Sequence, residues 1–195
     1  MTTGGSGSPT RAGLFYALAE NPYIPGILKH YGLSLKDLQQ LFWEAAEHYR
    51  SLEQEYWTLY VDGASHGNPG PAGAGALLRD SQGRVRVELR EYLGEATNNE
   101  AEYRALLLGL KAAIHRGIRC LYIFSDSKLV VQQLQGGYQV KSPKLKPLWQ
   151  SARILLNSFD AYAISHVDRA KNQLADRLAW EAIDQKATVD YNLIE

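Results

Sequence analysis

Four acidic residues lie where a folded chain rarely carries carboxylates. Asp62 and Asp126 each end an apolar run, "WTLYVD" and "RCLYIFSD". Glu102 and Asp176 each fall on the apolar face of a predicted helix. Because burying an ionised carboxylate without a partner costs several kcal/mol, each acid must be exposed, paired with a base, or bound to a cation.

The two strand-end acids would lie at the place where α/β sheets bind ligands, beyond the carboxyl ends of the strands. For Asp62 or Asp126 alone, a turn at Asp-Gly or a helix N-cap at Ser-Asp-Ser explains the acid at least as well. If Glu102 and Asp176 joined them, the four carboxylates would raise one another's pKa unless cations held them. Oxygen ligands without histidine or cysteine indicate Mg²⁺ or Mn²⁺, and two such ions can activate a water and stabilise the leaving oxygen of a phosphodiester.

The elements that must position these acids alternate along the chain from Trp57 onward. Strands are predicted over 57–63, 72–80, 84–93, 119–126 and 161–167, and helices over 98–116, 127–135, 143–157 and 171–187. The order βββαβααβα predicts an α/β fold with a mixed five-stranded sheet. In such a sheet an antiparallel meander is extended by parallel strands, and helices cover both faces.

The chain before residue 57 has a different character. Residues 1–13 are rich in Gly, Ser and Thr and are expected to form a disordered leader. Residues 14–56 are expected to be a helical N-terminal extension, in which Ser34 and Asp37 have the spacing of a capping box. Phe42 and Trp43 could anchor a pair of helices on the core or on another subunit, and helix-turn-helix spacing is the alternative.

The composition bounds the class of protein. Of 195 residues, 45% are hydrophobic and 22% charged, as in folded proteins. The single cysteine, Cys120, lies in an apolar run and favours a reducing, cytoplasmic location without disulfides or a cysteine-based zinc site. No membrane span or signal peptide is expected. Residues 57–195 hold 17 basic and 15 acidic residues. If four of these acids are clustered to bind metal, basic residues outnumber acidic ones on the remaining surface, and that surface can attract a polyanion.

Four stretches carry a family resemblance. They are "DGASHGNPGPAGAGALL" (62–78), "TNNEAEYRALLLGL" (97–110), "SDSKLVVQQLQGGYQVK" (125–141) and "HVDRAKNQLADRLA" (166–179). Together they resemble type 1 ribonuclease H over about residues 57–187. The resemblance implies the ribonuclease H fold, a catalytic domain over 57–190, and hydrolysis of the RNA strand of an RNA–DNA hybrid to 5′-phosphate and 3′-hydroxyl ends. It implies two Mg²⁺ or Mn²⁺ ions held, with substrate, by Asp62, Glu102, Asp126 and Asp176.

The same resemblance suggests substrate contacts. Asn68, Asn98 and Asn99 would reach into the minor groove of the hybrid, where amides both donate to and accept from 2′-hydroxyls and base edges. N-capping of the helix by Asn98 is an alternative use of that side chain, and both can hold at once. Thr97 would contact a phosphate of the DNA strand, and Ser65 is placed among the substrate-binding residues.

The sequence departs from many members of the family in two places. "HVDRAKNQLAD" is too short for the mobile loop that carries a histidine before the last aspartate, and resembles a shorter-looped branch with the pattern R-x-x-N-x-x-A-D. Arg169 of this pattern could place a positive charge near the leaving phosphate, or it could be an ordinary surface arginine. The basic protrusion of some relatives is missing too, and only Lys141, Lys144 and Lys146 concentrate there, as a phosphate track or a solvated face.

The function expected first is therefore an endoribonuclease acting on RNA–DNA hybrids in primer or R-loop removal. Cleavage of double-stranded RNA as an added activity fits the shorter-looped branch. A catalytically silent hybrid-binding module is an alternative from another class, disfavoured because all four acids are present. The sequence leaves the oligomeric state open.

Overall fold

The computed structural model describes residues 24–38, 40–41, 44, 56–186 and 188–191 of the chain. The chain divides into two compact units, residues 1–53 and residues 54–195, which are described separately. The expected leader and the proposed anchors Phe42 and Trp43 lie outside the described residues.

In the first unit, helix α2 (Ile24–His30) is followed by a turn and by helical residues 35–38, 40–41 and 44. Gly32 has a φ of +67°, a conformation that costs glycine little, and it lies in the turn between the two helical segments. The predicted capping box is confirmed. The backbone N–H of Asp37 donates to Ser34 Oγ at 3.2 Å, and the N–H of Ser34 donates to the Asp37 carboxylate at 2.6 Å.

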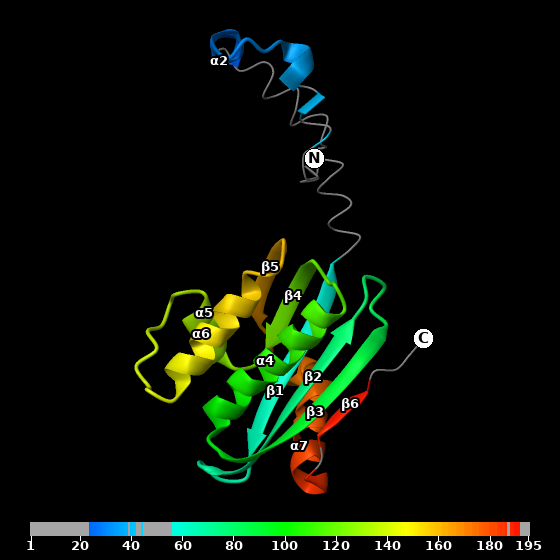
Figure 1. Cartoon of the computed structure of the whole chain (residues 1–195), viewed down its shortest axis with the longest axis vertical. Coiled ribbons are helices and arrows are strands. Elements are labelled where there is room, and N and C mark those ends of the chain that lie inside the picture. Colours follow the sequence, from blue (N-terminus) through cyan, green and yellow to red (C-terminus); the bar gives the residue numbers. More distant parts are fainter. Residues whose placement is uncertain (1–23, 39, 42–43, 45–55, 187, 192–195) are drawn as a thin grey trace, which may run out of the picture. The chain divides into compact units, whose positions relative to one another are not determined.

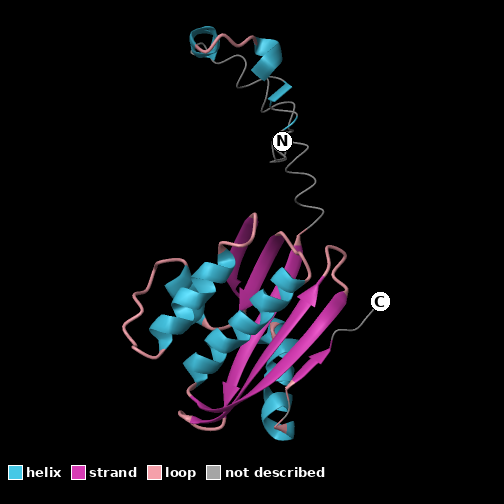
Figure 2. Ribbon diagram, in the orientation of Figure 1, coloured by secondary structure: helices cyan, strands magenta, loops and turns pink. Residues whose placement is uncertain are grey.

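In the second unit, a mixed sheet is built from the five predicted strands and one further strand (Figures 1 and 2). The strands are β1 (Trp57–Ser65), β2 (Gly70–Arg79), β3 (Val85–Ala96), β4 (Cys120–Ser125), β5 (Ala161–His166) and β6 (Val189–Tyr191). Their order in space is β5-β4-β1-β2-β3-β6. β1, β2 and β3 form the antiparallel meander, and β4 and β5 run parallel to β1. The short β6, which pairs antiparallel with β3, was not predicted.

The helices form two layers. They are α4 (Asn98–His115), α5 (Lys128–Leu134), α6 (Leu145–Leu156), the 3₁₀ turn η1 (Arg169–Lys171) and α7 (Gln173–Gln185). α4, α5 and α6 share the main core with one face of the sheet, and α7 packs against β1, β2 and β3 on the other face (Figure 1). The expectation of helices on both faces is confirmed. None of the described helices combines the length and apolarity needed to cross a bilayer.

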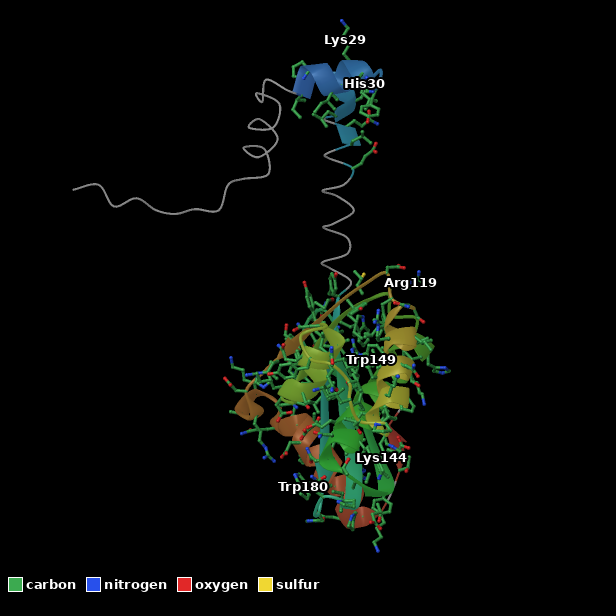
Figure 3. All side chains as sticks on the ribbon, turned by 90° about the vertical axis from the view of Figure 1, so that its left-hand side faces the viewer. Lys29, His30, Arg119, Lys144, Trp149 and Trp180 are labelled. Atoms are coloured by element: carbon green, nitrogen blue, oxygen red, sulfur yellow. The ribbon has the colours of Figure 1, made fainter. Side chains whose placement is uncertain are left out.

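Alternate side chains of β1 enter the two layers, as the two-residue period of a strand requires. Leu59 and Val61 belong to the main core, whereas Ala64 packs against α7. Trp149 and Trp180, labelled in Figure 3, come from α6 and α7. The strand that contains the first acid, Asp62, is therefore packed on both faces, and it continues to Ser65 rather than ending at the acid.

Two glycines let the helices approach the sheet closely. A Cβ on Gly63 would lie 2.1 Å from the backbone nitrogen of Glu102 in α4, and a Cβ on Gly75 would lie 2.2 Å from the carbonyl oxygen of Ala175 in α7. Real side-chain carbons do not approach backbone atoms this closely. The first turns of both acid-bearing helices thus rest directly on sheet backbone.

A stability prediction arises at the β2–β3 turn, where Asp80 is only 8% exposed. Burial alone would raise the pKa of Asp80, but hydrogen bonds from Arg86 and Arg84, together with the Gln82 N–H, hold it well below its usual value. A lowered pKa stabilises the folded chain above the ordinary pKa of 3.8, and this contribution is lost as the pH falls. We therefore expect Asp80→Asn to lower the thermal unfolding midpoint clearly at pH 7 and less at pH 3.

The matched control for this change is Asp184→Asn, because Asp184 is an exposed acid on α7. Thermal unfolding followed by circular dichroism at both pH values would measure the effect. Equal midpoints for Asp80→Asn and the unsubstituted chain at pH 7 would contradict the stabilising role of this turn.

Candidate active site

The four predicted acids come from four different elements of the second unit. Asp62 lies in β1, Glu102 in the first turns of α4, Asp126 directly after β4, and Asp176 in the first turn of α7. One carboxylate oxygen from each of the first three lies within 4.8 Å of the other two. Asp176 lies close enough to Asp62 to influence its ionisation. The structure thus brings together the acids that the sequence singled out.

Burial and repulsion by neighbouring charges make the carboxyls of Asp62 and Glu102 reluctant to ionise. Asp62 and Glu102 are 4% and 6% exposed. Burial first, and then the charges of Asp126 and Asp176, raise the pKa of Asp62 to about 8. Burial, followed by the charges of Asp62 and Asp126, also raises the pKa of Glu102 well above its ordinary value, against a hydrogen bond from the Gly63 N–H at 3.2 Å. The cluster needs protons or a cation to be stable.

The chemistry of the donors decides which cation fits. The cluster offers carboxylate oxygens from Asp62, Glu102 and Asp126, with no histidine or cysteine among them. Such all-oxygen sets suit hard divalent cations and disfavour zinc or copper. The residues present therefore fit a divalent metal ion.

An asparagine that the sequence analysis did not assign ties the cluster together. Asn172 is 1% exposed, and its Nδ2 donates to Asp126 Oδ1 and to the backbone oxygen of Val61, both at 2.9 Å. One amide thereby joins Val61 of β1 and Asp126, directly after β4, to the start of α7. The available signal was that Asn172 lies four residues before Asp176, on the same helical face.

Arg169 supplies a positive charge at the edge of the site. Its Nη2 donates to Asp176 Oδ1 at 2.6 Å, and its side chain is 69% exposed. Asp176 raises the pKa of the arginine further, so the guanidinium stays charged. Arg169 is therefore an exposed arginine paired with a predicted metal ligand.

The loop between β1 and β2 meets the start of α4. Asn68 Oδ1 accepts a hydrogen bond from the Asn98 backbone N–H at 3.2 Å, which brings two of the predicted substrate residues together. Asn68, Asn98 and Asn99 are all exposed. Ser65 Oγ donates to the Gly67 carbonyl at 2.6 Å, within the same loop. The three amides therefore form a polar rim at the amino end of the helix that carries Glu102.

The alternative use of Asn98, as the N-cap of α4, is not what the structure shows. The N-cap is Thr97, whose Oγ1 accepts from the Glu100 N–H at 3.3 Å, while the Glu100 carboxylate accepts from the Thr97 N–H at 2.9 Å. Thr97 forms this reciprocal box because a glutamate stands three residues after it, whereas Ala101 stands three residues after Asn98. The Asn98 side chain is not needed for the cap.

Two histidines lie beside the cluster. The ring of His66 packs 4.8 Å from the ring of Trp180. His166, the last residue of β5, has Nε2 3.1 Å from the backbone oxygen of Asp126. Both rings thus have contacts that hold the loops around the acids in place.

The raised pKa values lead to a prediction for the metal-free protein. A carboxyl with a raised folded-state pKa contributes stability that is fully present below its ordinary pKa and is lost as the pH rises through the folded value. Stability should therefore fall between pH 3.8 and about pH 8, the ordinary and folded values for Asp62. Mg²⁺ should reverse the loss, adding about 1.4 kcal/mol at about ten times its dissociation constant.

Thermal unfolding in EDTA and in Mg²⁺, at pH 5 and at pH 8, measures this effect. We expect a larger Mg²⁺-induced rise in the unfolding midpoint at pH 8, and no rise for Asp62→Asn. An equal rise at both pH values would place the ion elsewhere on the protein.

Known proteins are similar to this chain both in sequence and in fold. Residues 60–182 match the sequence model of a family described as "Reverse transcriptase-like". Over 125 residues, the chain is 46% identical to "Ribonuclease HI" of Halobacterium salinarum, a match that covers 64% of this chain and 63% of that protein. The crystal structure of RNase H1 from the same organism matches with a TM-score of 0.65 and 44% identity, covering 67% of this chain and 98% of that chain. LC11-RNase H1, solved in complex with an RNA/DNA hybrid, matches with a TM-score of 0.63 and 37% identity, again over 67% and 98% of the two chains.

The matched region is the one that holds the site. The family model spans more than half of the chain and contains all four clustered acids, from Asp62 to Asp176. The RNase H1 chains are covered almost completely. The chain therefore belongs to the type 1 ribonuclease H family.

Proposed function

We propose that the protein is a metal-dependent endoribonuclease that hydrolyses the RNA strand of RNA–DNA hybrids, leaving 5′-phosphate and 3′-hydroxyl ends. The observation that carries the proposal is the cluster of Asp62, Glu102 and Asp126, two of them buried and one half-buried, whose oxygens lie within 4.8 Å of one another. Further support comes from the solved complex of LC11-RNase H1 with an RNA/DNA hybrid.

Asp62, Glu102, Asp126 and Asp176 would hold the metal, which we propose to be Mg²⁺ or Mn²⁺, with two ions present when substrate is bound. Such ions, when bound, lower the pKa of water and stabilise the oxygens of an in-line phosphodiester displacement. The protein's own part is to keep the carboxylates in place. The Gly63 N–H orients Glu102, and the Asn172 amide orients Asp126.

The polar rim at the start of α4 would bind the hybrid. Exposed amides at Asn68, Asn98 and Asn99 can donate to and accept from 2′-hydroxyls and base edges of a minor groove. Thr97 and Ser65 would add phosphate or sugar contacts beside them. The 2′-hydroxyl is the group that separates RNA from DNA, so this rim would select the strand that is cut.

Arg169 would place its charge near the phosphate that leaves. Its exposure and its pairing with Asp176 support that role, because an exposed guanidinium can exchange a carboxylate partner for a phosphate oxygen. We also propose a cytoplasmic location, because the single cysteine of the chain, Cys120, has no second cysteine with which to form an intramolecular disulfide.

Cleavage of an end-labelled RNA–DNA hybrid in Mg²⁺, in Mn²⁺ and in EDTA tests the proposal. Matched single-stranded RNA, DNA duplex and double-stranded RNA of the same sequence define the substrate range. We expect cleavage of the hybrid with either metal and none in EDTA. Hybrid binding without cleavage in either metal would instead identify a silent binding module, and cleavage of double-stranded RNA would widen the substrate class.

A further inference from the structure

Within the part of the chain that the structure describes, no helix packs on β4 and β5 from the face that α7 occupies. Among the described residues, α7 packs against β1, β2 and β3, whereas α5 packs against β4 and β5 from the face of the main core. The register shows which side chains share the open face. Tyr60 in β1 pairs with Phe124 in β4, and Thr58 pairs with Tyr122, so these residues point away from the core residues Leu121 and Ile123.

Aromatic rings gather on this open face in two stacked pairs. The rings of Tyr56 and Tyr122 lie 4.4 Å apart, and those of Tyr60 and Phe124 lie 4.9 Å apart, with interplanar angles near 30° in both pairs. Tyr122 is 41% exposed, although it lies in the middle of a central strand. Large aromatic side chains on a sheet are normally covered, and this pattern is typical of a surface that binds a planar partner.

The next strand leaves the outer rings accessible. On this face, β5 places Ala163 beside Tyr122 and Ser165 beside Phe124. Both small residues are exposed. A planar group could therefore lie over β5 and extend the stack beyond the β4 rings.

Positive charge borders the aromatic face. A hollow of about 160 Å³ beside Tyr60 is lined by Arg79, Lys171 and Asn172, among others. The Arg79 guanidinium lies 5.6 Å from the centre of the Tyr60 ring, and its Nε is buried without a hydrogen-bond partner. Among the described residues, no carboxylate forms an ion pair with Arg79 or Lys171. The buried Oδ1 of Asn172 also lacks a partner.

We propose that this open face, formed by Tyr122, Phe124, Tyr60, Arg79 and Lys171, binds single-stranded nucleic acid. Bases would stack on the aromatic rings above the small side chains of β5, and phosphates would lie against the two cations. Aromatic platforms with bordering cations bind single strands because every base has a stacking face. A base-paired helix would not fit, since its bases are already stacked on one another.

Fluorescence anisotropy of a labelled single-stranded oligonucleotide of about 12 nucleotides, measured in EDTA, tests the proposal. EDTA separates this binding from cleavage, so the outcome does not depend on whether the protein proves to be a nuclease. Tyr122→Ala should weaken binding about tenfold, the typical effect of losing one stacking side chain, and Tyr122→Phe should restore it. RNA and DNA versions of the strand show whether the 2′-hydroxyl contributes.

Tyr162→Ala is the matched control. Tyr162 is 44% exposed and belongs to the neighbouring strand, but it pairs with Leu121 and so lies on the opposite face. We expect this variant to bind like the unsubstituted chain. Circular dichroism of each variant excludes unfolding as the cause of any loss.

The salt dependence gives an independent readout of the cations. Removing one phosphate contact should reduce the slope of the logarithm of the binding constant against the logarithm of the salt concentration by about 0.7. Lys171→Gln should show this reduction, and Lys186→Gln, at the other end of α7, should not. The proposal is overturned if the unsubstituted chain does not bind the single strand, or if Tyr122→Ala and Tyr162→Ala bind it equally well.

Discussion

Asp126→Asn should reduce cleavage of an RNA–DNA hybrid by about a thousandfold or more. The change nearly preserves the shape of the side chain but removes one ligand charge from the cluster of Asp62, Glu102 and Asp126. Metal ions in such sites contribute several kcal/mol of charge stabilisation to the transition state, and about 4 kcal/mol corresponds to about a thousandfold in rate. Initial rates on end-labelled hybrid, at saturating Mg²⁺ and then at saturating Mn²⁺, measure the loss.

The fold should survive this substitution, because the variant side chain can still accept the hydrogen bond from Asn172. Asp184→Asn is the matched control, since it removes an exposed acid of α7 outside the cluster and should cleave at the normal rate. Cleavage by Asp126→Asn within tenfold of the unsubstituted protein would refute the four-carboxylate site.

Gly63→Ala should both destabilise the second unit and abolish cleavage. Its new methyl group would lie 2.1 Å from Glu102 N and 2.2 Å from the Ala101 carbonyl carbon, so α4 would have to move away from β1. Overpacking usually costs about 1 to 3 kcal/mol, and contacts with rigid backbone belong at or above the top of that range. The displacement would also break the hydrogen bond from the Gly63 N–H to Glu102.

Gly109→Ala tests whether backbone contact is the cause. A Cβ at Gly109 lies on the same interface of α4 with β1, but it would meet the side chain of Leu59 at 2.5 Å, and a side chain can adjust. Because alanine also favours the helix by about 1 kcal/mol, we expect this variant to lose less than about 2 kcal/mol. Urea unfolding of both variants, together with their cleavage rates, would show the difference. Equal losses would mean that side-chain packing, rather than the close approach at Gly63, positions α4.

The order of strands β1 to β5 and of the helices could be predicted because these segments are long enough to show the pattern of apolar residues typical of a strand or a helix. β3 alternates over Val85, Val87 and Leu89, and the glycine after α4, Gly117, adopts a φ of +70°. β6 could not be found in this way, because three residues are too few to show alternation. Its pairing with β3 depends on residues about a hundred positions earlier in the chain.

The acids of the site were predictable for a similar reason, since each breaks an apolar pattern. The residues that orient them follow no local pattern. Asn172 reaches Val61, 111 residues away, and Gly63 donates to Glu102, 39 residues away. Such contacts follow from how helices dock on the sheet, so only the three-dimensional structure reveals them. The N-cap of α4 could have been predicted from Glu100, which stands three residues after Thr97. The sequence analysis instead considered Asn98 as the capping residue.

The hydrogen bonds from Asn172 to Val61 of β1 and to Asp126 also bear on when the metal site can first be complete. Ribosomes make strands β1 to β5 and α4 before they make α7, so a growing chain holds Asp62, Glu102 and Asp126 before it holds Asn172 or Asp176. Until α7 docks, Asp126 lacks its amide partner and the cluster lacks its fourth acid. Under the proposed function, a chain assembled in this order would lack a complete metal site, and so could not cleave RNA, until α7 has been made.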